Sequence, residues 1–334
     1  MHSNKGLAVK RRIWLALVAC AGLISWGPVG AQGANWPSKS ITLIVPFPPG
    51  GVTDLVAREL ARHLTEGLGQ SVVVENRAGA GGNIGTAMLA KANPDGHTLG
   101  VMTVSAISIA PHIHKSLNFN PSRDFTPITN IVNTPGAILA GVKTPYNTLP
   151  EMIAAAKAQP NKITYASVGQ GSLPHLIAEK LAADAGIRMT HVPYKGAAPA
   201  MQDLLASIVD LSFESSLTNT VANFQAGKLK VLATTGAVRV PILANIPTVA
   251  ESGYPGFVAQ GWFGFLGPAG LPAPIVKRLN ELATQMLRDK AMIERFEKLG
   301  IQPDPSSPEQ FARFLQEQDR IWAAIAKGLN LQLD

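Results

Sequence analysis

Cysteine is almost absent from this sequence, because Cys20 is the only one among 334 residues. A single cysteine excludes a disulfide framework and a cysteine-rich zinc or iron–sulfur site. Charged residues make up 15% of the chain, below the roughly 25% that is usual for soluble domains. Glycine and proline are plentiful instead, at 31 and 25 residues, so turns and loops are numerous. The length predicts about two domains, each large enough to bury its own core.

Much of the formal net charge of +7 lies at the N-terminus, where residues 1–31 contain four basic residues and no acidic ones. An apolar run of 14 residues, 13–26, follows the basic residues and is shorter than the about 20 residues of a membrane-spanning helix. Small residues at 29–31 complete the pattern of a secretory signal peptide. We expect cleavage after Ala31, which leaves a chain of charge +3 and no case for a nucleic-acid partner.

Two features leave the route of export open. Arg11-Arg12 before an apolar stretch is compatible with twin-arginine export. Residues 17–20, Leu-Val-Ala-Cys, are also compatible with lipid anchoring at Cys20. In each case the protein leaves the cytoplasm.

From residue 40 the chain alternates short apolar runs typical of strands with helical patterns. In a first unit we expect strands at 41–45, 71–75 and 98–104, with one helix capped by Thr53 and another at 83–91. This order implies a parallel sheet covered by helices. A second unit is expected to contain helices at 149–159, 172–185, 198–207 and 217–226, and strands at 163–166, 189–192, 209–213 and 229–234.

After Arg239 the chain becomes rich in proline and ends in helical patterns at 273–288, 289–299 and 308–327. Because this tail shows few strands, we expect it to return and pack on the first unit. The predicted domains are therefore 36–135 plus 240–334, and 136–239. Two α/β lobes that the chain crosses more than once form a hinge, and ligands bind in the cleft between them.

Two glycine-rich loops have equivalent positions in the two units. Residues 46–51, Pro-Phe-Pro-Pro-Gly-Gly, follow the first strand, and residues 167–172, Ser-Val-Gly-Gln-Gly-Ser, also lie between a strand and a helix. Ligands bind at such strand ends in open α/β sheets, and a helix N-terminus favours an anion. One loop alone is equally explained as a tight turn, but the pair predicts an anion clamp. Neither loop fits a Walker A motif or a good dinucleotide-binding fingerprint.

Catalytic and metal sites find little support. Ser105, His175 and an aspartate, Asp54 or Asp203, offer the residue types of a triad, but there is no Gly-x-Ser-x-Gly elbow. His175 is better explained as a residue that bonds its own loop. Because no paired carboxylate or cysteine accompanies the histidines at 112 and 114, we expect no metal.

Other polar and aromatic residues remain ambiguous. Lys195 suits an anion but is equally explained as a solvated lysine, and Glu214 suits a ligand ammonium or a neighbouring lysine. Trp262 and Phe263 are explained either by core packing or by a place on the wall of the cleft.

Taken together, the motifs resemble a known family along the chain from about Trp36 to the C-terminus. Any one block is a weak signal for the family, but nine blocks in the expected order are a highly specific one. They comprise residues 41–51, 74–85, 92–96, 165–171, 191–196, 199–204, 246–253, 255–256 and 262–264. They are similar to the substrate-binding proteins of tripartite tricarboxylate transporters, also called Bug (Bordetella uptake gene) proteins.

The resemblance implies a two-lobed, periplasmic binding protein-like fold of type II, with a hinged cleft between the domains. It implies a periplasmic, non-enzymatic protein that captures a small organic carboxylate and delivers it to the permease subunits of a tripartite transporter. In the family the two loops grip the carboxylate, largely through backbone N–H groups and ordered waters. Here those loops are 48–53 and 167–172, and no cofactor is implied.

The residues that we expect at the ligand lie in these loops and at neighbouring strand ends. They are Phe47, Pro48, Pro49, Gly50, Gly51, Val52, Thr53, Asp54, Ser105, Ser167, Gly169, Gly171, Ser172, His175, Tyr194, Lys195, Gly196 and Glu214. A valine at Gly50 or Gly171 is expected to clash with the carboxylate while the protein still folds.

Glu214 departs from the family, where we expect an aspartate, so the ligand itself cannot be carried over. Candidates for tuning ligand choice are Phe47, Val52, Ser105, Glu214, Ser216 and Thr218. Two rival functions stay open, a sensor that presents its ligand to a membrane signalling protein and a hydrolase or transferase.

Overall fold

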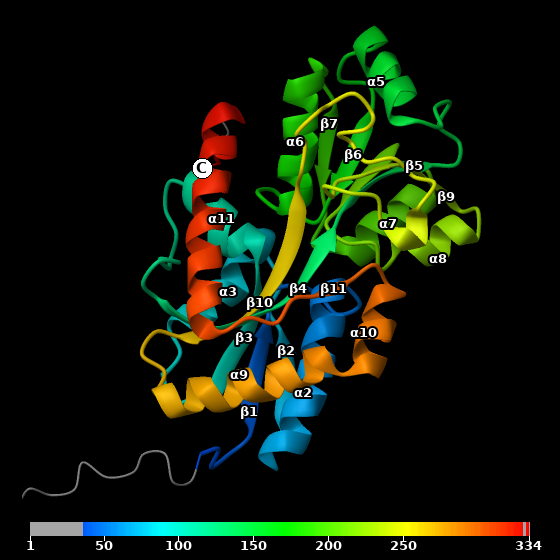
Figure 1. Cartoon of the computed structure of the whole chain (residues 1–334). Coiled ribbons are helices and arrows are strands. Elements are labelled where there is room, and N and C mark those ends of the chain that lie inside the picture. Colours follow the sequence, from blue (N-terminus) through cyan, green and yellow to red (C-terminus); the bar gives the residue numbers. More distant parts are fainter. Residues whose placement is uncertain (1–35, 330–331, 334) are drawn as a thin grey trace, which may run out of the picture. The chain divides into compact units, whose positions relative to one another are not determined.

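The computed structural model describes residues 36–329 and 332–333 (Figure 1). The predicted signal peptide and Cys20 lie outside these residues. From Pro37 onward the chain forms one compact unit, and that unit contains two separate β-sheets. None of the helices in the described part of the chain is long and apolar enough to span a membrane.

The first sheet has six strands in the order β11-β4-β10-β3-β1-β2. Its parallel part consists of β1 (Ile41–Val45), β2 (Val72–Asn76) and β3 (Thr98–Thr103), which confirms the three strands expected from the apolar runs. These strands are short and rich in Val, Ile and Leu, as is usual when helices cover both faces of a parallel sheet. The long α2 (Val52–Leu68) follows β1, and α3 (Asn83–Ala90) follows β2.

The rest of the first sheet is antiparallel and was not anticipated. β10 (Gln260–Pro268) lies between β3 and β4 (Phe125–Pro135) and is antiparallel to both, and β11 (Gln302–Pro303) pairs with the outer edge of β4. Three glycines interrupt the apolar pattern of β10. Gly264 is required by packing, because a Cβ there would lie 2.2 Å from Cζ of Phe311. The expectation of a tail poor in strands was therefore wrong.

The second sheet has five strands in the order β7-β6-β8-β5-β9. β6 pairs in parallel with both β7 and β8, whereas β5 is antiparallel to its neighbours β8 and β9. The strands are β5 (Ala137–Gly141), β6 (Thr164–Ser167), β7 (Thr190–Pro193), β8 (Leu211–Glu214) and β9 (Leu229–Thr234). The sequence predicted all of these except β5.

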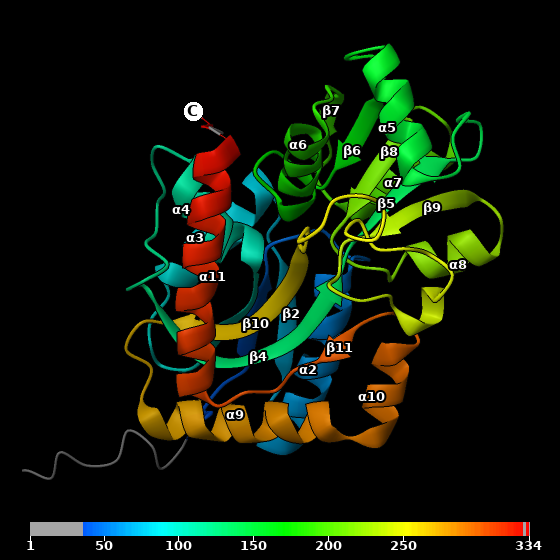
Figure 2. The ribbon, with the colours of Figure 1, turned by 45° about the horizontal axis from the view of Figure 1, so that its top comes forward.

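The remaining helices cover the two sheets (Figures 1 and 2). They are α4 (Ala110–Ile113), α5 (Leu149–Ala158), α6 (Leu173–Ala185), α7 (Ala197–Leu205), α8 (Thr220–Gln225), α9 (Ala273–Arg288), α10 (Lys290–Glu297) and α11 (Pro308–Leu329). Helix α9 packs against α2 and β4, and α11 packs against β4. The C-terminal helices therefore cover the first sheet, as expected.

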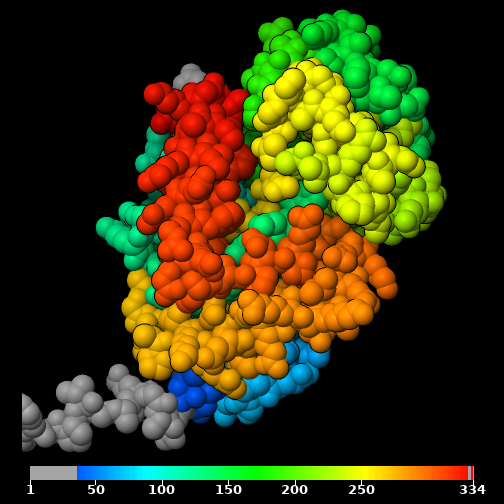
Figure 3. Space-filling view, in the orientation of Figure 1, coloured from blue at the N-terminus to red at the C-terminus, as the bar shows by residue number. Residues whose placement is uncertain are grey.

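Helix α11 also contacts α6, which belongs to the lobe of the second sheet. In Figure 3 it lies directly against that lobe. One buried apolar cluster accordingly includes Phe311 and Trp322 of α11 together with Leu176 of α6. We use "first lobe" and "second lobe" for the parts of the chain that surround the six-stranded and the five-stranded sheet.

The chain crosses between the lobes at Gly136 and again at residues 235–259, and Thr235 joins these two crossings. Its hydroxyl accepts a hydrogen bond from the Gly136 N–H at 2.9 Å and donates one to the Ala259 carbonyl at 2.6 Å. Gly136 permits this close approach, because a Cβ there would lie 2.2 Å from the carbonyl oxygen of Glu214. Nearby, the hydroxyl of Thr134 donates to the Ser215 carbonyl at 2.6 Å.

Candidate functional site

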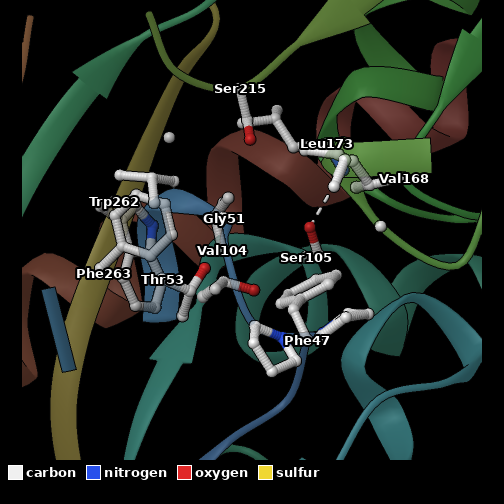
Figure 4. A pocket seen from close by; sticks show the side chains of 18 residues that line it. Phe47, Gly51, Thr53, Val104, Ser105, Val168, Leu173, Ser215, Trp262 and Phe263 are labelled. Carbon is white, nitrogen blue, oxygen red and sulfur yellow. Dashed lines mark hydrogen bonds between the residues drawn. The ribbon is translucent and has the colours of Figure 1, made fainter. Parts of the chain in front are cut away.

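A cavity of about 590 Å3, counting its open mouth, lies between the two lobes (Figure 4). From the first lobe it is lined by the loop after β1, by the end of β3 and by β10. From the second lobe it is lined by Val168, by the starts of α6 and α7, and by Ser215. Each sheet thus presents the carboxyl ends of parallel strands to the same space, where ligands bind in open α/β sheets.

Three helices begin at this cavity. Their N-caps are Gly51 for α2, Ser172 for α6 and Gly196 for α7, and none of the three caps its helix with a side-chain hydrogen bond. The helices contain 17, 13 and 9 residues. The first-turn residues on the cavity wall are Val52, Thr53, Leu173, Ala197 and Ala198. In α6 the Leu173 N–H is bonded to Ser105 and Pro174 has no N–H. Since first-turn N–H groups carry partial positive charge, the starts of α2 and α7 make this wall suit an anion.

The expected cap at Thr53 was wrong, because Gly51 is the N-cap of α2 and Thr53 lies within its first turn. Asp54 instead supports the loop from behind. Its carboxylate accepts hydrogen bonds from the Gly50 N–H at 3.1 Å, from Arg58 Nε at 2.9 Å and from Asn76 Nδ2 at 3.0 Å. Burial by itself raises the pKa of Asp54, but these hydrogen bonds outweigh it and hold the pKa below its usual value. Asp54 therefore shapes the loop and does not line the cavity.

The serine–glycine loop of the second lobe is held by its own side chains. The Ser172 hydroxyl donates to the Gly169 carbonyl at 2.6 Å, and Ser167 Oγ lies 2.7 Å from His191 Nε2. The Gly171 N–H donates to His175 Nδ1 at 3.1 Å, which confirms that His175 bonds its own loop. These contacts organise the loop. Only Val168 within it and Leu173 directly after it line the cavity.

The buried His175 and the half-buried His191 stack on each other beside this loop. The imidazoles of His175 and His191 lie 4.1 Å apart at 11°. Burial lowers the pKa of each to about 4, and for His191 the charge of the other imidazole lowers it further. Both rings are therefore neutral at pH 7, which leaves His175 Nδ1 able to accept the loop N–H.

Ser105 makes a direct link across the cavity. It opens a π-helical turn at 105–109, and its hydroxyl accepts a hydrogen bond from the Leu173 N–H of α6 at 3.0 Å (Figure 4). Both residues are buried, at 4% and 1% exposure. The hydroxyl thus joins the first lobe to an otherwise unsatisfied donor at the start of a helix in the second lobe.

Several expected site residues face a neighbouring space instead. Gly169, Tyr194 and Lys195 line a second cavity of about 820 Å3, together with residues 79–82. Phe47 and Val168 border both cavities. The two cavities therefore adjoin at these two side chains, and Lys195 lines the second.

Glu214 lies in β8 and points away from the first cavity. It is 4% exposed, and its carboxyl group accepts a hydrogen bond from Ser212 Oγ at 2.8 Å. Burial raises its pKa to about 7. Ser215, the next residue, lines the cavity, because successive residues of an extended chain face opposite sides. The tuning candidates Ser216 and Thr218 do not line it either.

The wall also contains residues that the sequence interpretation missed. They are Thr103, Val104, Leu173, Ala197, Ala198, Ser215 and Gly261. Trp262 and Phe263 are both buried and on the wall, so both explanations offered for them apply. Because sites form at strand ends and helix starts, Val104 and Ala197 could have been predicted from the sequence. Gly261 could not, because the sequence of β10 has no recognisable strand pattern.

The residue types of a catalytic triad are not brought together. Ser105 bonds the Leu173 N–H, His175 bonds the Gly171 N–H, and Asp203 accepts a hydrogen bond from the Tyr194 hydroxyl at 2.5 Å. His112 contacts Asp319 at 2.8 Å. Within residues 36–329 and 332–333, no group of three or more His, Cys, Asp and Glu side chains is placed to hold a metal ion.

Glycine positions also revise the expected variants. Gly50 and Gly171 adopt φ of +92° and +76°, so any side chain there strains the backbone, and neither lines the first cavity. Gly51 has φ of −86° and lines the cavity, and a Cβ added there meets no atom within 4 Å. The expected clash with the carboxylate stays a prediction at Gly50 and Gly171, whereas Gly51 admits a side chain toward the cavity without backbone strain.

Comparison with known proteins connects this geometry to a family. A protein-family model described as "Tripartite tricarboxylate transporter family receptor" matches residues 56–331 of this sequence. BugT of Bordetella pertussis is 35% identical over 95% of this chain and 96% of its own length.

Solved structures agree with this match. The periplasmic binding protein BugD is 37% identical with a TM-score of 0.85, over 89% of this chain and 99% of BugD. Rpa4515 of R. palustris, solved with adipate, is 33% identical with a TM-score of 0.86, over 89% of this chain and 99% of that protein. This chain therefore belongs to the receptor family of tripartite tricarboxylate transporters, whose members are periplasmic solute-binding proteins.

Proposed function

We propose that this protein captures a small organic acid in the cavity between its lobes and holds the carboxylate at the N-termini of α2, α6 and α7. The convergence of three helix N-termini on one cavity, none of them capped by its own N-cap side chain, carries this proposal. The Leu173 N–H of α6 is bonded to Ser105, so α2 and α7 offer the N–H groups to the ligand. Each such terminus stabilises an anion by about 0.3–2 kcal/mol. The bound adipate of the relative Rpa4515 supports a carboxylate as the ligand class.

The proposal explains why a receptor for an anion needs no arginine at its site. Hydrogen bonds from backbone N–H groups to a charged acceptor contribute about 1.5–3 kcal/mol each. The loops that present these groups are held by Asp54 and by the stacked histidines. Binding therefore loses little free energy to ordering of the loops.

Ligand capture is accompanied in this proposal by closure of the lobes 36–135 plus 240–334 and 136–239. Gly136 and Thr235 mark the crossings on which the lobes rotate. The hydrogen bond between Ser105 and the Leu173 N–H belongs to the closed arrangement. If open molecules dominate without ligand, the observed affinity falls in proportion to the closed fraction.

The proposal also covers how the protein is exported, which partner receives the ligand, and whether the ligand is changed. The N-terminal segment directs the chain to the periplasm, by the general or the twin-arginine route or with a lipid on Cys20. The closed receptor then delivers its ligand to the permease subunits of a tripartite transporter and does not transform it.

Thermal shift with matched acids and amides tests the ligand class. At about 10 mM, a ligand with a Kd of about 0.1 mM adds about 2.7 kcal/mol of stability. We expect a rise in Tm with one or more of butyrate, hexanoate, benzoate and adipate, and no rise with the corresponding carboxamides. No shift with any carboxylate, or equal shifts with acid and amide, contradicts the proposal.

Gly51→Val tests the place of binding. The valine is expected to fold normally, because φ is −86° and the added Cβ meets no atom. It is expected to weaken binding of the responding acid at least about tenfold, or about 1.4 kcal/mol, because its methyl groups occupy the start of α2. Gly328→Val, in exposed backbone of α11, is the control. Equal affinities in the two variants would place the ligand elsewhere.

A further inference from the structure

The second cavity, like the first, lies between the two lobes. The first lobe lines it with the glycine-rich loop at 79–82, and the second lobe lines it with residues 168–170 and Lys195. The two loops touch, because a Cβ added to Gly81 would lie 3.0 Å from the carbonyl oxygen of Gln170. Closure of the lobes therefore shapes this space together with the first cavity.

The two cavities meet at one side chain from each lobe. Phe47 of the first lobe and Val168 of the second line both cavities, and Figure 4 shows both side chains at the first. At the start of α7, Gly196 lines the first cavity and Lys195, the residue before it, lines the second. Since successive Cα atoms are only about 3.8 Å apart, Lys195 begins next to the wall where the proposed function places a carboxylate.

Lys195 brings a positive charge to this combined space. Among the described residues it is the one Lys, Arg, Asp or Glu that lines either cavity, and His114 is the other titratable side chain on the lining. Lys195 is exposed and forms no ion pair with a described residue. Asp203, also on α7, accepts the Tyr194 hydroxyl at 2.5 Å. The Lys195 ammonium is therefore available to an anionic group of a ligand.

We propose, on the basis of the proposed function, that the two cavities form one ligand site in which Lys195 holds a second anionic group. The first carboxylate lies at the starts of α2 and α7, the ligand body passes Phe47 and Val168, and the second anionic group pairs with the ammonium. Such a charged hydrogen bond is stronger than a neutral one. The three glycines of 79–82 leave room for this end of the ligand, because they carry no side chains.

Deletion of the charge on each side of this pair tests the assignment. The ligands are succinate, adipate and suberate, each matched with its half-amide, which keeps the length and replaces one carboxylate by a neutral group. Isothermal titration of the ligand-free protein and of Lys195→Gln gives the affinities for the pair that binds most tightly. We expect Lys195→Gln to weaken the diacid at least about fivefold and to leave the half-amide within about twofold. The control Lys228→Gln removes an exposed charge of the second lobe that lines neither cavity, and should change neither affinity.

The outcomes separate the inference from the proposed function. An unchanged diacid affinity in Lys195→Gln, equal losses for diacid and half-amide, or the same loss in Lys228→Gln overturns the inference and leaves the proposed function intact. Binding of monoacids alone does the same. If neither these compounds nor the monoacids of the thermal-shift test bind, the proposed function and the inference fail together.

Reversal of the charge provides an independent test. Lys195→Glu is expected to fold, because the side chain is exposed. The unaltered protein should bind the diacid more tightly than the amino acid that has an ammonium in place of the second carboxylate. Lys195→Glu should reverse this order, since its carboxylate repels one end group and attracts the other. An unchanged order of affinities in Lys195→Glu contradicts the inference.

Discussion

Replacement of Ser105 by alanine removes the hydrogen bond that joins the two lobes inside the cavity. The Leu173 N–H, 3.0 Å from Ser105 Oγ, would lose its acceptor at a position that is 1% exposed. A buried donor without a partner costs about 1–3 kcal/mol. Because the bond spans both lobes, this cost falls on the closed arrangement that holds the ligand. The expected loss of affinity is therefore about 5-fold to 150-fold.

Isothermal titration with the acid that gives the largest thermal shift measures this loss, and small-angle scattering compares the open and closed populations. Ser108→Ala is the matched control, since Ser108 lies in the same π-helical turn, is 0% exposed, and its hydroxyl has no partner among the described residues. We expect its affinity to stay within about twofold. Affinity within twofold in Ser105→Ala, or an equal loss in both variants, would refute the reasoning.

Three further predictions concern buried polar groups. His175 and its stacked partner have a pKa of about 4 when folded and 6.5 when unfolded, so denaturant titrations should show about 2 kcal/mol lost per histidine from pH 7 to pH 5, and a flat profile would contradict this. The carboxyl of Glu214, with its pKa raised from 4.5 to about 7, should lower stability as pH rises above 4.5, by about 3 kcal/mol at pH 8. Glu214→Gln should remove that dependence, and an unchanged pH profile in the variant would argue against it. Thr103→Val replaces a buried hydroxyl without a partner in the described part of the chain and should stabilise the protein by about 1 kcal/mol, whereas a lower midpoint of unfolding would count against it.

The parallel strands and their helices were readily predicted because their patterns are local. The apolar run at 41–45 and the helical spacing at 273–288 correspond to β1 and α9 without a change of bounds. Strands β4 and β10 escaped notice for a physical reason. Pro127 interrupts β4 where the short β11 does not pair with it. In β10, Gly264 admits the ring of Phe311 from α11, and Gly267 admits the side chain of Leu271. Such close contacts between distant segments leave no periodic signal.

The site was predicted unevenly for a related reason. The loop after β1 lines the cavity from Phe47 to Thr53, apart from Gly50, as expected for a loop between a strand and a helix. The serine–glycine loop mostly supports its own conformation through His175 and Ser172. Motifs identify residues that a loop needs, but they do not separate the residues that contact a ligand from those that hold the loop in place.

The sequence by itself determined the α/β units, the two glycine-rich loops and the family, because these depend on residue spacing along the chain. Only the tertiary structure decided which groups meet. It placed three helix N-termini on one cavity, turned Glu214 away from that cavity and brought Ser105 to the Leu173 N–H. The physical reason is that these relations depend on how two lobes and a central strand from the C-terminal part of the chain pack together. That packing is set by many small contacts between residues far apart in sequence.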